Sequence, residues 1–496
     1  MELHERIYEL ALTRSFFYPS NEPYGQVSGF YDYGPTGWQI KRRLQALWRR
    51  MFIQEEGFLE VESSIVTPEI VLKASGHVEE FTDPVVECEK CHTKVRADHL
   101  VESKIEFKWD GKLETLTAKI RDNEIKCPSC GGRLSDAFAS NLMFHTGIGA
   151  GQETAYLRPE TAQGIFTAFP RVFRNHGAKL PMAIGQVGRS FRNEISPRRS
   201  LVRMREFTQM ELEYFFNPKI PTIEGFEGVR EKKIRILTRE EQEGSGAPKW
   251  MSAGEIVERG IANEIMAYFL VKEWEYYTIA GLAPDAMWFR HLRADETPHY
   301  SRSNVDLEVE TSHGIVEIAG NAYRTDYDLG RHAQFSKKDL SVFSEETKEK
   351  VVPHVVEVSM GVDRLFFCML EHSFREKSEG KDWEWFDFSP FVAPYDLCVF
   401  PLMKKDGLRE KAESIVLMMR EAGLEASFSD AGSIGRRYAK ADEIGVPYAV
   451  TIDYQTLEDD SVTIRFRNDG KQERIALEKL ADKIRKLKKE GKLALG

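Results

Sequence analysis

The chain has 496 residues, 42% of them hydrophobic and 30% charged, which is typical of water-soluble globular proteins and leaves room for about three domains. Its formal net charge of −10 argues against sequence-blind binding of nucleic acid, and no apolar run approaches the roughly 18 residues of a membrane span. The charged N-terminus is unlike a signal peptide, so we expect a cytoplasmic protein without a membrane partner.

A helix followed by a strand is the pattern predicted near the N-terminus. Apolar residues recur at helical spacing from Ile40 to Met51, and Gly57 ends this helix. Residues 58–68 then run extended into a proline.

Four of the six cysteines form two CxxC pairs in the polar stretch of residues 83–140. Thiolates from two such pairs can hold a zinc ion in tetrahedral geometry, and an intracellular setting disfavours disulfides. We therefore expect structural Zn²⁺, with free thiols as the alternative, and a hairpin between the two pairs. The predicted metal ligands are Cys88, Cys91, Cys127 and Cys130.

Strands, loops and helices alternate from residue 141 to about residue 370. Charged residues punctuated by Gly and Pro follow Asn217 and indicate a second insertion, taken as residues 217–285. The GIGAG run at Gly147–Gly151 is similar to a dinucleotide-binding fingerprint, but no apolar strand precedes it. A plain glycine loop is therefore favoured.

The stretch from Ser190 to Phe215 combines five arginines and four glutamates. Its last ten residues alternate, so Glu211 and Glu213 share one strand face. Such neighbours repel each other unless a cation lies near them. The pattern predicts an antiparallel hairpin with a basic loop and an acidic floor. A salt-bridged surface hairpin is the alternative, and it suits the loop arginines 198 and 199 better than the embedded acids.

A second acidic strand is predicted downstream, in HVVEVSMGVDR. Glu357 and Ser359 share one strand face, and a helix starts at Gly361 with Arg364 in its first turn. A polar strand face, a glycine that allows close approach and a positive helix end together suit a phosphate ligand. Glu317, in IVEIAGNAYR, is a third acid of this kind.

Strands and helices alternate again over residues 390–496, which indicates a compact mixed α/β domain. We expect a helix between LCVFPL and EASFSD, and a glycine-bearing loop at AGSIGRRYAKADEIG. In that loop, Arg436 and Arg437 either contact nucleic acid or form salt bridges with Asp442 and Glu443.

Taken together, these motifs resemble those of class II aminoacyl-tRNA synthetases. The RNE and Arg-x-Arg-Glu-Phe runs are similar to motif 2 (near residues 185–215), and the Gly-x-Asp-Arg helix start to motif 3 (near 354–370). Residues 38–68 are similar to motif 1, the dimer-forming element. SGH at Ser75–His77, YLRPETAQGIF and GSIGRRYAKADEIG resemble glycyl-tRNA synthetases of the homodimeric archaeal and eukaryotic kind, and the likeness covers nearly the whole chain.

The resemblance implies an α/β (α+β) fold in three parts. These are a class II catalytic domain on an antiparallel sheet (residues 1–82 and 141–380), the cysteine-bearing insertion (83–140) and an anticodon-binding domain (390–496). It also implies an ATP-dependent glycine–tRNA ligase and a homodimer. With ATP and Mg²⁺ the enzyme would form glycyl-adenylate, and would then transfer glycine to the 3′ end of tRNA(Gly).

By the same resemblance, Arg192 and Arg364 are the catalytic residues, at the α-phosphate and against the adenine and γ-phosphate. Glu194 accepts from the adenine amino group, and Phe207 stacks under the ring. The implied ATP-binding set is Arg192, Asn193, Glu194, Val202, Arg203, Met204, Arg205, Glu206, Phe207, Glu317, Ile318, Gly361, Val362, Asp363 and Arg364.

Selection of glycine requires contacts with its ammonium group and no room beside its Cα, because glycine has no side chain. Excluding larger amino acids in this way needs no editing domain. The resemblance implies a glycine-binding set of Arg96, Glu160, Glu211, Arg324, Glu357 and Ser359, although Tyr323 stands where an acid is common.

Two alternatives stay open. One is a class II synthetase for another small amino acid, such as serine, threonine or proline, which the RPETAQG and GSIGRR runs disfavour. The other is a non-catalytic synthetase-like protein that binds nucleic acid. Such relatives are expected to lose the ATP-site arginines, whereas this chain keeps Arg192, Arg203 and Arg364.

Overall fold

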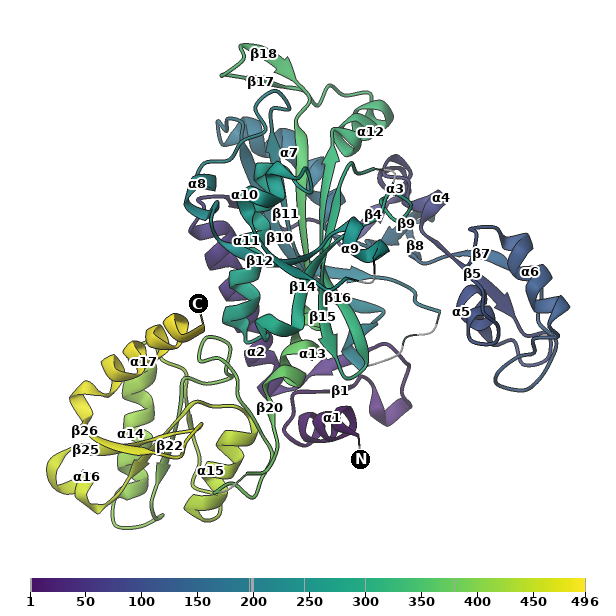
Figure 1. The fold of residues 1–496 in the computed structure, drawn as a ribbon. Coiled ribbons are helices and arrows are strands. Elements are labelled where there is room, and N and C mark those ends of the chain that lie inside the picture. Colours follow the sequence, from purple (N-terminus) through teal and green to yellow (C-terminus); the bar gives the residue numbers. More distant parts are fainter. Residues whose placement is uncertain are drawn as a thin grey trace.

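A nine-stranded sheet is the frame of the largest unit (Figure 1). The computed structural model describes residues 2–195, 197, 200–244, 246–298, 300–378 and 380–495, so the loop arginines 198 and 199 lie outside the described residues. Within the nine-stranded sheet, neighbouring strands are antiparallel except β12 with β14 and β10 with β3. In order across the sheet, the strands are β13 (Lys249–Ser252), β12 (Lys233–Leu237), β14 (Met287–His291), β15 (Asn304–Thr311), β16 (Gly314–Thr325), β19 (His354–Gly361), β11 (Glu206–Phe216), β10 (Met182–Phe191) and β3 (Leu59–Glu60).

Strand β11 shows how the sheet divides into an apolar and a polar face. Met210 and Leu212 belong to the main hydrophobic core, whereas the alternate residues Gln209 and Glu211 border a cavity. The predicted period-two pattern is therefore confirmed. Further along the cavity face, Phe215 packs under a helix, which limits the open part of this face to one end of β11.

Helices cover both faces of the sheet. The apolar face packs against α2 and the almost completely buried α11, and the far end of the cavity face packs against α7. The helix predicted from Ile40 to Gly57 is confirmed as α2 continued by a π-helical segment, Arg49–Gln54. The helices of this unit are α1 (Leu3–Thr13), α2 (Pro35–Trp48), α3 (Glu69–Ala74), α4 (His77–Glu80), α7 (Ala162–Asn175), α8 (Phe226–Val229), α9 (Arg239–Glu243), α10 (Ala253–Glu258), α11 (Glu264–Ala280), α12 (Tyr327–Ser336) and α13 (Val362–Ser373).

Residues 217–285, predicted as a second insertion, are continuous with this unit. They supply β12 and β13 at the edge of the main sheet, and α11 beneath it. The charged residues that suggested a separate segment lie on its outer side, while Phe226, Ile234 and Ile256 join the main core. The segment therefore has no core of its own among the described residues.

The cysteine-bearing insertion projects to one side of the sheet (Figure 1) and has a small core of its own. The hairpin predicted between the two cysteine pairs is wrong, because the structure has one short strand and two helices there. The reason is the helical spacing of Leu116 and Ile120, which bury one face of α6. The elements are β5 (Thr82–Glu87), β6 (Lys94–Arg96), α5 (Ala97–Glu102), α6 (Leu113–Asp122) and β7 (Phe138–Asn141).

The C-terminal domain is a mixed α/β domain, as predicted, and its sheet has five strands. The glycine-bearing loop predicted at AGSIGRRYAKADEIG is wrong. Residues Ile434–Glu443 form α15, which begins where the Ser433 hydroxyl accepts the backbone N–H of Arg436. Two further elements, α16 and β26, were not predicted. Across the sheet the strands are β23 (Ala426–Phe428), β22 (Leu397–Pro401), β24 (Tyr448–Ile452), β25 (Ser461–Phe466) and β26 (Gln472–Ala476), with helices α14 (Leu408–Glu421), α15, α16 (Tyr454–Asp459) and α17 (Leu480–Leu495).

Several short strands complete the fold, and no helix in the described part of the chain has the length and apolar character that crossing a membrane requires. The remaining strands are β1 (Phe17–Pro19) with β2 (Tyr31–Tyr33), β4 (Val66–Pro68) with β9 (Glu153–Leu157) and β8 (Phe144–Ile148), β17 (Val342–Ser344) with β18 (Glu349–Val351), and β20 (Phe374–Arg375) with β21 (Trp385–Phe386).

Candidate active site

A cavity of about 350 Å³ opens over β11, β19 and β16. Its floor is assembled by register, because Glu211 lies opposite Ser359, and Ser359 opposite Gly320. Residues of both predicted ligand sets meet here. From these sets the lining includes Glu160, Arg192, Glu194, Val202, Arg203, Met204, Phe207, Glu211, Glu317, Ile318, Glu357, Ser359, Gly361, Asp363 and Arg364.

Glu211 is the most completely hydrogen-bonded acid of the floor. One carboxylate oxygen accepts from the Thr161 backbone N–H at 2.9 Å and from the Thr161 hydroxyl, and the other from Gln209 at 2.8 Å and Ser359 at 2.7 Å. Burial, and then the charge of Glu160, raise the pKa of Glu211, while the Thr161 and Ser359 hydrogen bonds oppose this rise.

Glu357 and Arg324 form a buried ion pair beside this floor. Arg324 donates to Glu357 at 2.9 Å and to both oxygens of Asp328 at 2.7 and 2.9 Å, and it does not line the cavity. Burial raises the pKa of Glu357 to about 7, although the Arg324 charge lowers it and Glu211 raises it further. Deeper still, burial and then Glu357 raise the pKa of Glu213 well above its usual range. The cation expected near the two acids is Arg324, whose charge opposes the rise in the pKa of Glu213.

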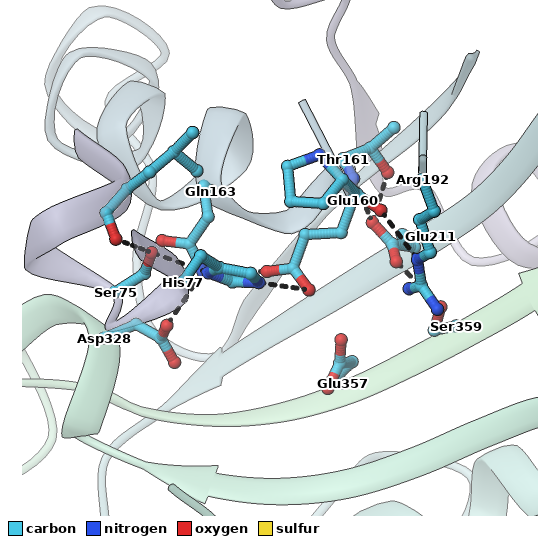
Figure 2. A network of polar contacts seen from close by, with 12 residues as sticks. Ser75, His77, Glu160, Thr161, Gln163, Arg192, Glu211, Asp328, Glu357 and Ser359 are labelled. Carbon is cyan, nitrogen blue, oxygen red and sulfur yellow. Dashed lines mark hydrogen bonds and ion pairs between the residues drawn. The ribbon is translucent and has the colours of Figure 1, made fainter. Parts of the chain in front are cut away.

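Glu160 completes a set of three carboxylates around one space (Figure 2). It follows β9 and accepts from the Gln163 side chain at 2.9 Å, while His77 lies 3.4 Å from its second oxygen. Burial raises its pKa, but the charges of His77 and Arg324 outweigh burial and hold this pKa below the usual glutamate range.

Arginines border the other end of the cavity. The guanidinium of Arg192 lies between the rings of Phe81 and Phe207, 5.3 Å from each centroid. Arg364 donates to the Glu317 backbone carbonyl at 2.8 Å and lies 3.4 Å from the Glu317 carboxylate. Cationic side chains thus face the acidic end of the same cavity.

Arg203 is tied to an acid of the same set. It pairs with Glu194 at 2.6 Å, so its guanidinium is held beside the arginine end of the cavity. This pair also accounts for two of the charges in the stretch from residue 190 to 215.

Asp363 lines the cavity, but its oxygens are already used. One accepts from Lys41 and from the Tyr33 hydroxyl, both at 2.6 Å, and the other from the Thr208 backbone N–H at 2.6 Å. This network joins α2, β11 and α13. Asp363 therefore holds the start of α13 in place.

Like Arg324, five further residues of the predicted ATP-binding and glycine-binding sets do not line the cavity. Arg96 pairs with Asp83 and Asp98 at the base of the insertion, and Glu206 pairs with Arg189 on the surface. The remaining three, Asn193, Val362 and Arg205, are neighbours of lining residues in the chain.

Asp306 and Thr161 are lining or supporting residues that the sequence reasoning missed. Burial, and then the neighbouring Glu317, raise the pKa of Asp306 to about 8. Asp306 reaches the cavity only through the pairing of β15 with β16, opposite Gly320, and no local pattern marks it. Thr161, in contrast, directly follows Glu160 in the RPETAQG run.

The four cysteines of the insertion form one cluster, as predicted. Their sulfur atoms all lie within 4.8 Å of one another, and the two closest pairs are 3.5 and 3.7 Å apart. Tetrahedral zinc with four thiolates requires sulfur separations of about 3.8 Å, so the cluster fits this ion.

The two arginines of α15 have different surroundings. Arg437 is buried and donates to the Pro401 carbonyl at 2.5 Å, whereas Arg436 is exposed. The alternative in which these arginines pair with Asp442 and Glu443 is wrong, because Asp442 pairs with Arg465 and Lys381, and Glu443 with Arg14.

Comparison with known proteins supports the resemblance to class II aminoacyl-tRNA synthetases. A family model for the tRNA synthetase class II core domain (G, H, P, S and T) matches residues 146–297, and one for an anticodon binding domain matches 396–487. The prolyl-tRNA synthetase of Cryptosporidium parvum, solved with halofuginone and AMPPNP, has a TM-score of 0.60 over 100% of this chain and 77% of its own. At 12% identity this likeness concerns the fold alone.

Two archaeal glycine–tRNA ligases are similar over nearly their full length. That of Methanothrix thermoacetophila is 40% identical, over 98% of this chain and 97% of the relative. That of Methanocaldococcus jannaschii is 38% identical, over 99% and 100%. The chain therefore belongs to the family of glycine–tRNA ligases, within class II of the aminoacyl-tRNA synthetases.

Proposed function

We propose that this enzyme activates glycine with ATP and transfers it to the 3′ end of tRNA(Gly). The observation that supports this most strongly is the juxtaposition in one cavity of buried carboxylates and fixed guanidinium groups. Glycine carries a positively charged ammonium group and ATP carries negatively charged phosphates, and the reaction brings the two molecules together. A site for both must therefore hold charges of opposite sign side by side.

In the first step, the glycine carboxylate attacks the α-phosphorus of ATP, forming the mixed anhydride and releasing pyrophosphate. Negative charge grows on the phosphoryl oxygens in the transition state. A guanidinium fixed beforehand stabilises that charge without reorganisation, which lowers the barrier more than it favours substrate binding. Arg192 suits this role because two aromatic rings and the Pro159 carbonyl already hold it.

Arg364 is assigned to the other end of the nucleotide. Its hydrogen bonds to the carbonyls of Val202 and Glu317 fix the guanidinium plane at the start of α13. A fixed plane can lie against the adenine ring while its charge offsets the outer phosphates. No side chain needs to form a covalent bond, since positioning and electrostatics suffice for the transfer.

The acidic end of the cavity is assigned to the glycine ammonium group. Glu160 and Glu357 offer carboxylate oxygens that neutral hydrogen-bond donors do not saturate, whereas Glu211 already accepts four hydrogen bonds. Glu211 therefore fixes the floor, and Glu160 and Glu357 supply the charge that attracts the ammonium. Arg324 partly neutralises Glu357 and keeps the buried acids compatible with folding.

Mg²⁺ accompanies ATP in this enzyme class, and the cavity has suitable donors. Magnesium prefers carboxylate and phosphate oxygens, and Asp306 and Glu317 both line the wall beside Arg364. The raised pKa of Asp306 next to Glu317 indicates two acids that a divalent cation would stabilise. When bound, the ion would neutralise charge on the phosphates. Asp306 and Glu317 are the residues that would hold it.

The remaining parts are assigned by family membership together with the structure. The C-terminal domain is proposed to bind the anticodon arm of tRNA(Gly), with Arg436 as an exposed cation on it. Zn²⁺ in the cysteine cluster is proposed to stabilise the insertion. A homodimer in the cytoplasm is proposed. Exposed apolar side chains support the dimer, namely Trp38, Ile65 and Val66 of the motif 1 region and Ile70 two residues after it.

Amino-acid-dependent pyrophosphate exchange tests the proposal in one experiment. We expect glycine to drive the exchange of labelled pyrophosphate into ATP, and serine, threonine, proline and alanine to be at least roughly a hundredfold less effective. Exchange driven best by another amino acid would favour a different class II specificity. No exchange with any amino acid would favour the non-catalytic binding protein.

A further inference from the structure

The segment Ser75–Phe81, which includes α4, leads into the cysteine-bearing insertion. We call it the base segment. It contributes no residue to the cavity lining, yet it contacts one residue of the acidic end and one of the arginine end. These two contacts come from side chains four positions apart.

At the acidic end, His77 connects the base segment to Glu160 (Figure 2). Its Nε2 lies 3.4 Å from Glu160, and its Nδ1 lies 2.7 Å from the hydroxyl of the buried Ser75. Contacts on both ring nitrogens fix the plane of the imidazole. The Gln163 side chain donates to the other carboxylate oxygen of Glu160, so His77 and Gln163 together determine where this carboxylate lies.

At the arginine end, Phe81 connects the base segment to Arg192. The guanidinium carbon of Arg192 lies over the Phe81 ring and over the Phe207 ring, 5.3 Å from each centroid. The rings of His77 and Phe81 are themselves 5.7 Å apart. The positions of Glu160 and Arg192 are thus linked through one short helix.

The returning strand of the insertion fixes the base segment in turn. The Asn141 side chain donates to the Val78 carbonyl at 2.9 Å, and the Leu142 backbone N–H to the Phe81 carbonyl at 3.0 Å. The Leu142 carbonyl then accepts the backbone N–H of Asn193 at 2.6 Å. Both ends of the insertion are therefore bonded to each other and to the residue that follows Arg192.

We infer that His77 and Phe81 are positioning residues for the proposed reaction, His77 acting through Glu160 on glycine and Phe81 acting through Arg192 on ATP. The inference rests on the proposed function. A residue that acts through a binding group changes the Michaelis constant of the substrate which that group binds. A residue that merely keeps α4 folded changes both constants together.

The test measures the Michaelis constants for glycine and ATP by pyrophosphate exchange in the full-length enzyme. We expect His77→Ala to raise the constant for glycine roughly tenfold or more with that for ATP unchanged, because a loosened carboxylate misplaces the ammonium. We expect Phe81→Leu, which keeps apolar volume but loses the ring face, to show the opposite split. His77→Gln, which keeps an N–H donor, should recover part of the glycine affinity.

Matched controls separate these effects from damage to the fold. His176→Ala and Phe343→Leu change exposed residues of the same types outside the site, and should leave both constants at wild-type values. Combining His77→Ala with Glu160→Gln should raise the glycine constant little beyond Glu160→Gln alone, because both changes remove one interaction. Thermal unfolding of each variant reports whether it is folded.

Two results would overturn the inference. One is wild-type constants in folded His77→Ala and Phe81→Leu, and the other is an equal rise of both constants in each. If His77→Ala does not fold, the constants of His77→Gln and Phe81→Leu decide. Lack of glycine-dependent exchange in the unmodified enzyme is a different failure, because it would overturn the proposed function itself.

Discussion

At the scale of single residues, the site is defined by which charges are already neutralised. Glu211, Glu213 and Glu357 lie on the same face of the sheet, and burial raises the pKa of all three, but hydrogen bonds from Thr161 and Ser359 oppose this rise at Glu211. Three chemically identical side chains thus differ in what they can bind. Their surroundings, rather than their spacing, determine the difference.

The charge of Arg192 is expected to be essential for the first step. We predict that Arg192→Ala lowers glycine-dependent pyrophosphate exchange by roughly 10²- to 10³-fold, because a fixed cation at the reacting phosphate is lost. Thermal unfolding should be nearly unchanged, since among the described residues the side chain makes a single hydrogen bond, to the Pro159 carbonyl. Arg189→Ala, three residues earlier on the surface, is the matched control. Exchange at the wild-type rate in Arg192→Ala would refute the assignment.

Glycine affinity is expected to depend on pH through Glu357. With its pKa raised to about 7, Glu357 is mostly protonated below that pH, and an ammonium group must then displace a proton in order to bind. The Michaelis constant for glycine should therefore fall as pH rises from about 6 to about 8, by up to roughly tenfold per unit below the pKa. Steady-state exchange over this range measures it. Glu357→Gln should flatten the dependence, and a flat wild-type profile would contradict the assignment.

At the scale of elements, strand faces were predictable and partners across the sheet were not. The alternation that places Glu211 on a polar face is local, so it survives in the fold. Asp306 enters the site through a strand pairing that no local pattern encodes. In the C-terminal domain, Arg437 turned from a predicted loop residue into a buried donor to Pro401, because a serine starts a helix there.

The cysteine-bearing insertion is an element whose stability is expected to depend on metal. We predict about one zinc per chain by elemental analysis, because the four sulfur atoms lie within 4.8 Å of one another and can therefore share one ion. Chelation should increase hydrogen exchange across residues 83–140 and leave the main sheet protected, since the insertion has a separate small core.

Cysteine variants sharpen this test. Cys127→Ser should lose the zinc, while Cys398→Ser, in the C-terminal sheet and outside the cluster, should keep it. A chain purified without any bound metal, and with an insertion as protected as the main sheet, would rule out the zinc site.

At the scale of the whole molecule, the two large units are joined by the buried ion pair of Arg43 and Asp396. Asp396 accepts from Arg43 of α2 at 3.0 Å and from Lys488 of α17 at 2.8 Å, and it is only 5% exposed. Arg43 and Asp396 are 353 positions apart in the chain, which explains why the sequence predicted both units but not their contact. The domain limits themselves stay predictions.

Self-association is the property expected of the whole molecule. We predict a light-scattering mass of about twice 57.0 kDa. Ile70→Glu should shift the mass toward that of one chain, because it places a charge among exposed apolar residues of the motif 1 region. Leu457→Glu, an equally apolar exposed position in the C-terminal domain, should not. A single-chain mass for the unmodified protein at micromolar concentration would exclude the dimer.

The closeness of Phe81 and Leu142 has a consequence for how such enzymes diversify. Their backbones are one hydrogen bond apart, although about sixty residues separate them in the chain. A segment of different length or sequence could therefore connect these two residues without displacing the strands of the main sheet. We therefore expect changes of length or sequence between these two points to leave the catalytic cavity intact.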